Sequence, residues 1–128
     1  MKIDRFEDME IWKDARDLCK YVFELTSKDQ FNKDFRFRDQ IRASAGSVMD
    51  NIAEGFERGG NKEFGQFLYF SKGSCGETRS QGYRAFDFKY ITETELIQLN
   101  ESTMKLSTKI AHLIKYLKDS DLKGAKYH

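Results

Sequence analysis

Apolar residues recur at alternating steps of three and four residues through most of this chain, which is the spacing of one face of an α-helix. This pattern defines four segments. They cover residues 6–26, residues 34–58, a third segment that starts at Asn61, and a fourth that starts at residues 92–95 and ends near Asp119. The 128 residues include no proline, which also favours helices. We therefore predict an all-α protein.

The signals between these segments predict where the helices begin and end. Residues 27–32 are polar and lack periodicity, so we interpret them as a connection, with Asn32 or Asp34 as the N-cap that follows. Gly59-Gly60 ends the second helix, Asn61 can cap the third, and Thr92 and Glu95 have the spacing of a capping box before the fourth. Short connections join antiparallel neighbours, so we expect an up-down-up-down four-helix bundle. Residues 1–119 form its single domain, and residues 120–128 form a frayed tail.

The second predicted helix carries a polar stripe beside its apolar one. The apolar positions are Ile41, Ala45, Val48 and Ile52, and the polar stripe consists of Gln40, Ser44, Ser47, Asn51 and Glu54. Serine and asparagine are mediocre helix formers, so their repeated use needs an explanation. Close packing against a neighbouring helix is one explanation, and a functional surface is the other.

The Gly59-Gly60 turn allows an estimate of the register between the second and third helices. If they fold back on each other there, residues whose numbers sum to about 119 lie opposite one another. This estimate places Gly46 opposite Gly73 and Arg42 level with Glu77. We expect the glycines to allow unusually close backbones, so that Gly46→Leu destabilises the fold.

Composition limits the classes of partner. With 22 basic and 21 acidic residues the net charge is +1, so no global field attracts nucleic acid or an anionic membrane. No apolar run has the length of a signal peptide or a membrane span. Cys19 and Cys75 are too few for a disulfide framework or a zinc site. We expect reduced thiols in a cytoplasmic protein without a membrane partner.

No group of residues suggests catalysis, a metal or a cofactor, and no small-molecule substrate is evident. His112 and His128 do not form a pair with metal-ligand spacing. Glu54 and Glu77 could be compared with the carboxylates of di-iron bundles, but the Glu-x-x-His motif of those proteins is missing. Our preferred interpretation gives Arg42, Asn51 and both glutamates structural hydrogen bonds at the margin of the bundle.

Arginines on the second helix are the candidates for binding nucleic acid. They are interleaved with Phe35 and Phe37, and arginines with aromatic residues suit a surface that binds phosphates and bases. The candidates are Arg36, Arg38, Arg42 and Arg58. Because Asp34 and Asp39 dilute this patch, the alternative is a solvated face crossed by salt bridges.

Several of these residues also carry a family resemblance. Gln40-Ile41-Arg42, Ser47, Asn51 with Glu54-Gly55, and Glu77 resemble the motif of the 23S rRNA intervening-sequence family, often described as ribosomal-protein-like. The resemblance implies a four-helix bundle assembled as a ring-shaped homopentamer. A related branch, the accessory variability proteins of diversity-generating retroelements, is strongly basic and works with nucleic acid. The near-neutral charge of this chain differs from that branch.

Two functional hypotheses follow. The third helix carries more aromatic residues than one bundle seam needs, which favours a homo-oligomer. This oligomer could be a non-enzymatic accessory protein associated with rRNA, with other RNA or DNA, or with a ribonucleoprotein, through its arginines. Alternatively, it is a protein-protein interaction scaffold with no nucleic-acid role.

Overall fold

Helices account for the whole regular structure of the described chain. A computed structural model describes the backbone of residues 3–126 and the side chains of residues 3–120. Its long helices are α1 (Glu10–Thr26), α3 (Phe35–Glu57), α4 (Asn61–Asp87) and α5 (Glu93–Lys126). Two short elements, the 3-10 turn η1 (Phe6–Asp8) and the helix α2 (Asp29–Lys33), complete the fold. The predicted all-α class is confirmed.

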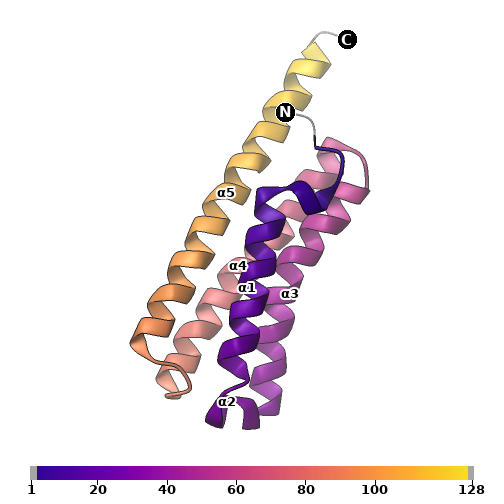
Figure 1. Ribbon diagram of the computed structural model, residues 1–128. Coiled ribbons are helices and arrows are strands. Elements are labelled where there is room, and N and C mark those ends of the chain that lie inside the picture. The colour runs from indigo at the N-terminus through magenta and orange to yellow at the C-terminus, as the bar shows by residue number, and fades with distance from the viewer. Residues whose placement is uncertain (1–2, 127–128) are drawn as a thin grey trace.

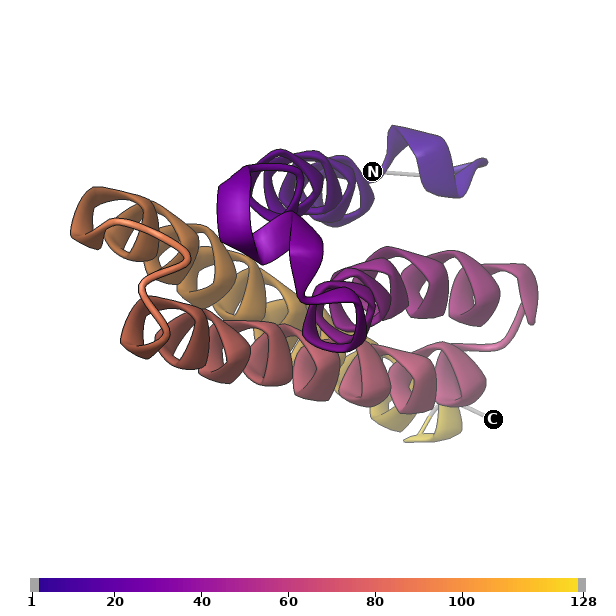
Figure 2. The ribbon, with the colours of Figure 1, turned by 90° about the horizontal axis from the view of Figure 1, so that it is seen from below.

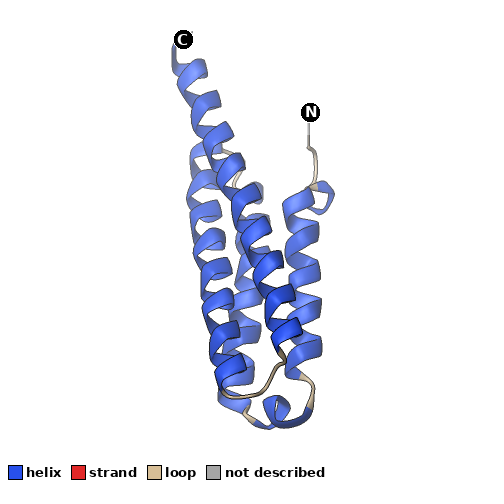
Figure 3. Ribbon diagram, turned by 90° about the vertical axis from the view of Figure 1, so that its left-hand side faces the viewer, coloured by secondary structure: helices blue, strands red, loops and turns tan. Residues whose placement is uncertain are grey.

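The four long helices lie side by side with alternating directions (Figures 1 and 3). Both ends of the chain lie at one end of the bundle, and α2 lies at the opposite end (Figure 1). Viewed along the bundle, α4 lies between α3 and α5, with which it makes the most extensive contacts (Figure 2). α1 packs mainly on α3 and less extensively on α5. No helix in the described part of the chain is long and apolar enough to cross a membrane.

The core follows the predicted apolar positions. The second-helix positions Ile41, Ala45, Val48 and Ile52 are at most 1% exposed. Trp12 is partly buried and packs against Phe6, with their ring centroids 5.2 Å apart. One stripe from each long helix therefore fills a single interior, as expected for burial of apolar surface.

The helix boundaries confirm most of the predicted signals. Asp34 caps α3 by accepting a hydrogen bond from the Phe37 amide at 3.3 Å. Thr92 and Glu95 form the reciprocal capping box, with hydrogen bonds of 2.8 and 3.1 Å. Gly59 has φ +87°, the left-handed conformation that ends a helix without steric cost in glycine. The predicted cap at Asn61 is wrong, because Gly60 holds the N-cap position without a side-chain hydrogen bond.

The interpretation of residues 27–32 as an irregular connection is wrong in part. α2 forms a short helix there, and its Phe31 is fully buried. Phe31 stacks on Phe37 and Tyr90 with centroid distances of 5.3 and 5.1 Å. A helix of one turn is too short to show periodicity, so polar neighbours hid its single anchoring residue.

The outer limits of the first and last helices also differ from the prediction. α1 begins at Glu10 rather than at Phe6, because η1 occupies the intervening residues. α5 continues as helix to Lys126, past the predicted end near Asp119. The rest of the predicted tail, residues 127–128, lies outside the described residues.

The predicted register between α3 and α4 is correct, but the predicted glycine contact is wrong. Ser71 donates a hydrogen bond to the carbonyl of Val48 at 2.7 Å, and these residue numbers sum to 119. A Cβ atom placed at Gly46 or Gly73 would meet nothing within 4 Å. The turn fixes how residues lie along the axis, but not how each helix is rotated about its axis, so both glycines face open space instead of packing on each other.

Close packing against α4 occurs instead at Gly55. A Cβ atom there would lie 2.6 Å from the Cβ atom of Phe67, a contact that a Cβ cannot make. Phe67 cannot relieve it by rotation, because its Cβ is attached directly to the backbone of α4. Gly55 therefore sets the distance between α3 and α4 near their connecting turn.

We predict opposite effects for two alanine substitutions within α3. Gly55→Ala should lower the free energy of unfolding by about 1–3 kcal/mol, because it overpacks the contact with Phe67. Gly46→Ala should raise it by up to about 1 kcal/mol, because alanine is the better helix former and its Cβ meets open space. Urea denaturation of both variants tests this pair. A stabilised Gly55→Ala variant would contradict the described packing.

Candidate functional site

The polar stripe of α3 lies against α4. Ser44 donates a hydrogen bond to Glu77 at 2.6 Å, and Ser74 donates one to Ser47 at 2.9 Å. Farther along, Arg84 donates to the side-chain oxygen of Gln40 at 3.0 Å. We call these three pairs, together with the bond from Ser71 to Val48, the polar seam. Of the two explanations for the stripe, packing against a neighbouring helix accounts for these contacts.

Ser47 and Asn51 form the middle of the polar seam. The amide nitrogen of Asn51 donates to both the side-chain oxygen and the carbonyl of Ser47, each at 2.8 Å. Ser47 thus accepts from Asn51 and from Ser74, one on its own helix and one on α4. These bonds fix the orientation of the Asn51 amide, because its nitrogen must face Ser47.

An open groove of about 430 Å³ lies over the polar seam on the outside of α3 and α4. Ser47, Asn51, Ser74 and Glu77 line it, together with Gly73 and two aromatic residues. These aromatic residues, Tyr69 and Phe70, are 50% and 59% exposed. We call this the α3–α4 groove. It brings Ser47, Asn51 and Glu77 together, three of the residues predicted from the motif.

The remaining motif residues have separate structural contacts. Gln40 is held by Arg84, Glu54 accepts a hydrogen bond from Arg58 at 3.1 Å, and Gly55 packs on Phe67. Arg42 points to α1 instead of Glu77, and its Nε donates to the hydroxyl of Thr26 at 2.8 Å. Arg42, Asn51, Glu54 and Glu77 each take part in a side-chain hydrogen bond, and the partner of Glu77 is Ser44.

The candidate arginines do not form one patch. Arg36 and Arg58 are separated by about 33 Å along α3, given the rise of a helix. Arg38 pairs with Asp39 at 3.0 Å and donates to Asn32, while Arg42 covers the ring of Phe23 at 4.5 Å. Among the described residues, Arg36 has no hydrogen bond or ion pair and is exposed. The geometry therefore leaves Arg36 as the most available of the four.

Sequence reasoning missed Arg84. Its guanidinium lies 4.4 Å from the centroid of Phe37 and also donates to Gln40, so it ties α4 to α3 at the end near α2. The register estimate could have pointed to Arg84, because it places this residue of α4 about one turn beyond Gln40, the first residue of the polar stripe. The predicted set of arginines was restricted to the second helix, and Arg84 lies on the third.

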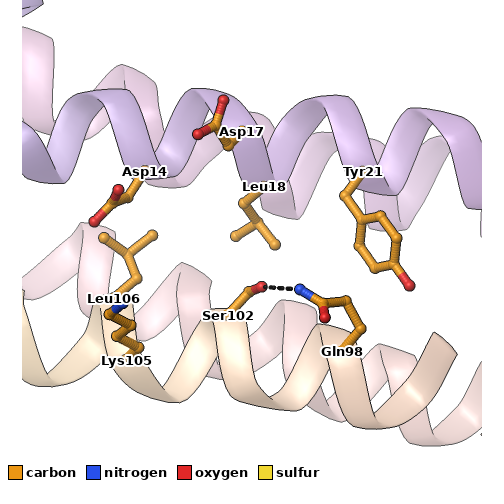
Figure 4. Close-up of a pocket in the computed structure, with 8 residues that line it drawn as sticks. All are labelled: Asp14, Asp17, Leu18, Tyr21, Gln98, Ser102, Lys105 and Leu106. Carbon is orange, nitrogen blue, oxygen red and sulfur yellow. Dashed lines mark hydrogen bonds between the residues drawn. The ribbon is translucent and has the colours of Figure 1, made fainter. Parts of the chain in front are cut away.

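A second groove, of about 320 Å³, separates α1 from α5 (Figure 4). Asp14 and Asp17 line it from α1, and Gln98, Ser102 and Lys105 line it from α5. Gln98 and Ser102 hydrogen-bond each other rather than bridging the groove (Figure 4). At its end Lys109 bonds Asp14 and Glu10, which raises the pKa of Lys109 and lowers that of Glu10. Lys109 thus fastens α1 to α5.

The two cysteines are free thiols inside the bundle. Burial raises the pKa of both Cys19 and Cys75 to about 11, so both are protonated at neutral pH. Each S–H group donates to a backbone carbonyl, Cys19 to Ala45 and Cys75 to Thr103. Within the described residues, no group of three potential metal ligands is gathered.

Comparison with known proteins identifies a family for nearly the whole bundle. A family model described as 23S rRNA-intervening sequence protein matches residues 7–119. The matched segment includes all four long helices as far as Asp119, and with them the complete polar seam. No curated protein matches the chain.

We predict that Arg42 stabilises the fold whereas Arg36 does not. Arg42→Ala should lower the free energy of unfolding by about 1–2 kcal/mol, because it removes the hydrogen bond to Thr26 and the contact with Phe23. Arg36→Ala, the matched control on the same helix, should change it by less than about 0.5 kcal/mol. Chemical denaturation measures both. Equal effects would show that Arg42 is not bonded to α1 in solution.

Proposed function

Because this chain belongs to the 23S rRNA-intervening sequence protein family, we propose that it is a non-enzymatic, cytoplasmic accessory protein that works as a homo-oligomer. The observation that carries this proposal is an apolar surface shared by α4 and α5. Its side chains are between 37% and 54% exposed: Tyr83, Phe86, Ile97 and Met104. We call it the α4–α5 apolar surface.

These four side chains lie on the same side of the bundle. Asn100 on α5 donates a hydrogen bond to the hydroxyl of Tyr83 at 3.0 Å. Ile97 and Met104 lie one turn before and one turn after Asn100, so they share its side of α5. Phe86 has the same relation to Tyr83 on α4. A cluster of exposed apolar side chains on a soluble protein is typical of an interaction surface.

A second copy of this chain is the proposed occupant of that surface. Gly76 lies two turns from Tyr83 on α4, and a Cβ atom there would meet nothing within 4 Å, which leaves room for a neighbour. The net charge of +1 makes repulsion between copies small. We propose a ring-shaped homopentamer, as the family resemblance implies. A closed ring needs two different surfaces on each copy, and the α4–α5 apolar surface would be one of them.

Association with rRNA, or with another nucleic acid or ribonucleoprotein, is the role that the family description supports. The specific observation in favour of it is Arg36, which is exposed and follows Phe35, itself 64% exposed. Five copies in a ring would repeat this pair five times. A protein scaffold without a nucleic-acid role is the second candidate, and it is favoured by the structural contacts of Arg38, Arg42 and Arg58.

We predict that the protein is oligomeric and that charged substitutions on the α4–α5 apolar surface dissociate the oligomer. Light scattering coupled to size exclusion should give several times the chain mass of 15.0 kDa. Ile97→Lys/Met104→Lys should shift the protein toward the monomer, because association would bury two unpaired charges. Tyr116→Lys, a control at a residue that is 65% exposed elsewhere on α5, should leave the mass unchanged.

A wild-type protein that is monomeric at micromolar concentration would contradict self-association. An oligomer that survives Ile97→Lys/Met104→Lys would instead place the interface on another surface.

We predict weak, salt-sensitive RNA binding that depends on Arg36. Arg36→Ala should lower the slope of log affinity against log salt by about 1 for each phosphate that the arginine neutralises, without changing sequence preference. Arg42→Ala should leave this slope unchanged, because its guanidinium is bonded to α1. Titration with single-stranded and duplex RNA at two salt concentrations measures this slope for the wild type and both variants. Absence of binding at low salt would favour the scaffold.

A further inference from the structure

We infer that the α3–α4 groove binds an arginine side chain presented by a partner protein. The groove is lined by groups that accept hydrogen bonds and by two exposed aromatic rings. This combination matches a guanidinium, which has five N–H donors, no acceptor and a flat face that stacks on rings. The inference concerns the face between α3 and α4, so it does not depend on the proposed α4–α5 interface.

Two oxygen atoms of the groove are left available as acceptors. The amide nitrogen of Asn51 is fixed by Ser47, so its Oδ1 is the free end of that amide. Glu77 accepts from Ser44 through Oε1. Within the described side chains, neither Asn51 Oδ1 nor Glu77 Oε2 has a hydrogen-bond partner. Each of these oxygens can accept a hydrogen bond from a ligand that brings donors, and the carboxylate of Glu77 also favours a positive charge.

Aromatic rings and open space complete the site. Phe70, 59% exposed, can place a ring face beside a bound guanidinium. Tyr69 forms the edge of the groove, and its ring already has the ammonium of Lys118 5.1 Å from its centroid. Gly73 also lines the groove, and a Cβ atom at this position would meet nothing within 4 Å. The space over Gly73 is therefore free for an incoming side chain.

The chain binds its own guanidinium groups in the same way. Arg84 lies 4.4 Å from the Phe37 centroid and donates to the amide oxygen of Gln40. Arg58 lies 5.0 Å from the Phe67 centroid and donates to the carboxylate of Glu54. The α3–α4 groove offers both kinds of acceptor, amide and carboxylate, beside aromatic rings. A phosphate would instead meet the negative charge of Glu77, which argues against a nucleic-acid ligand.

The probe for this site is the peptide acetyl-Gly-Arg-Gly-amide, compared with the same peptide carrying citrulline. Citrulline keeps the shape of arginine but lacks the charge. Titration followed by the NMR amide signal of Gly73 should give at least about tenfold weaker binding for the citrulline peptide, as expected for the loss of a charge-assisted hydrogen bond.

Three variants locate the binding. Glu77→Gln should weaken binding of the arginine peptide by about tenfold, whereas Glu57→Gln, a control at an exposed glutamate on α3, should not change it. Gly73→Leu should abolish binding while the protein stays folded, since leucine favours the helix and occupies the groove.

Three results would overturn the inference. They are equal binding of the arginine and citrulline peptides, unchanged binding to Gly73→Leu, and no shift of the Gly73 signal at millimolar peptide. A duplex RNA that shifts the Gly73 signal when the arginine peptide does not would assign the groove to nucleic acid. None of these results bears on the mass of the oligomer, so this inference and the proposed self-association can fail separately.

Discussion

The polar seam between α3 and α4 is the contact on which the rest of this bundle depends. α4 lies between α3 and α5, so the position of α4 on α3 determines where the last helix packs. Apolar contacts alone allow helices to slide and rotate, whereas hydrogen bonds from Ser44 to Glu77 and from Ser71 to Val48 require one register. Gly55 then sets the separation of the helices near the turn.

The sequence predicted the structural features that depend on the spacing of residues along the chain. The helices, the capping box at Thr92 and the level of Ser71 against Val48 all follow from periodicity, cap chemistry and one glycine turn. It did not predict rotation about the helix axis, because that depends on which side chains fill the interior. The register alone therefore puts Gly46 opposite Gly73, although both face open space. α2 was not predicted, because its single buried residue, Phe31, cannot form a periodic pattern by itself.

The candidate site was predicted in part for the same reason. The polar stripe identified a face of α3 that differs from an ordinary solvated face, and this face packs against α4. The groove above the α4 partners depends on the rotation of both helices, so Tyr69 and Phe70 could not be assigned to the site. Of the residues that carry the family resemblance, Gln40, Ser47, Gly55 and Glu77 make contacts between α3 and α4. Functional binding is therefore expected in the groove over the seam, where Asn51 and Glu77 are exposed to a ligand, and on the surfaces beside it.

A double-mutant cycle on Ser44 and Glu77 tests most directly whether the polar seam holds α3 against α4. Unfolding of Ser44→Ala, Glu77→Ala and the double variant would be compared with the wild type. The 2.6 Å hydrogen bond predicts a coupling energy of about 1 kcal/mol between the two sites. Additive effects within about 0.3 kcal/mol would contradict the account, because they would mean that the two side chains do not interact in the folded protein.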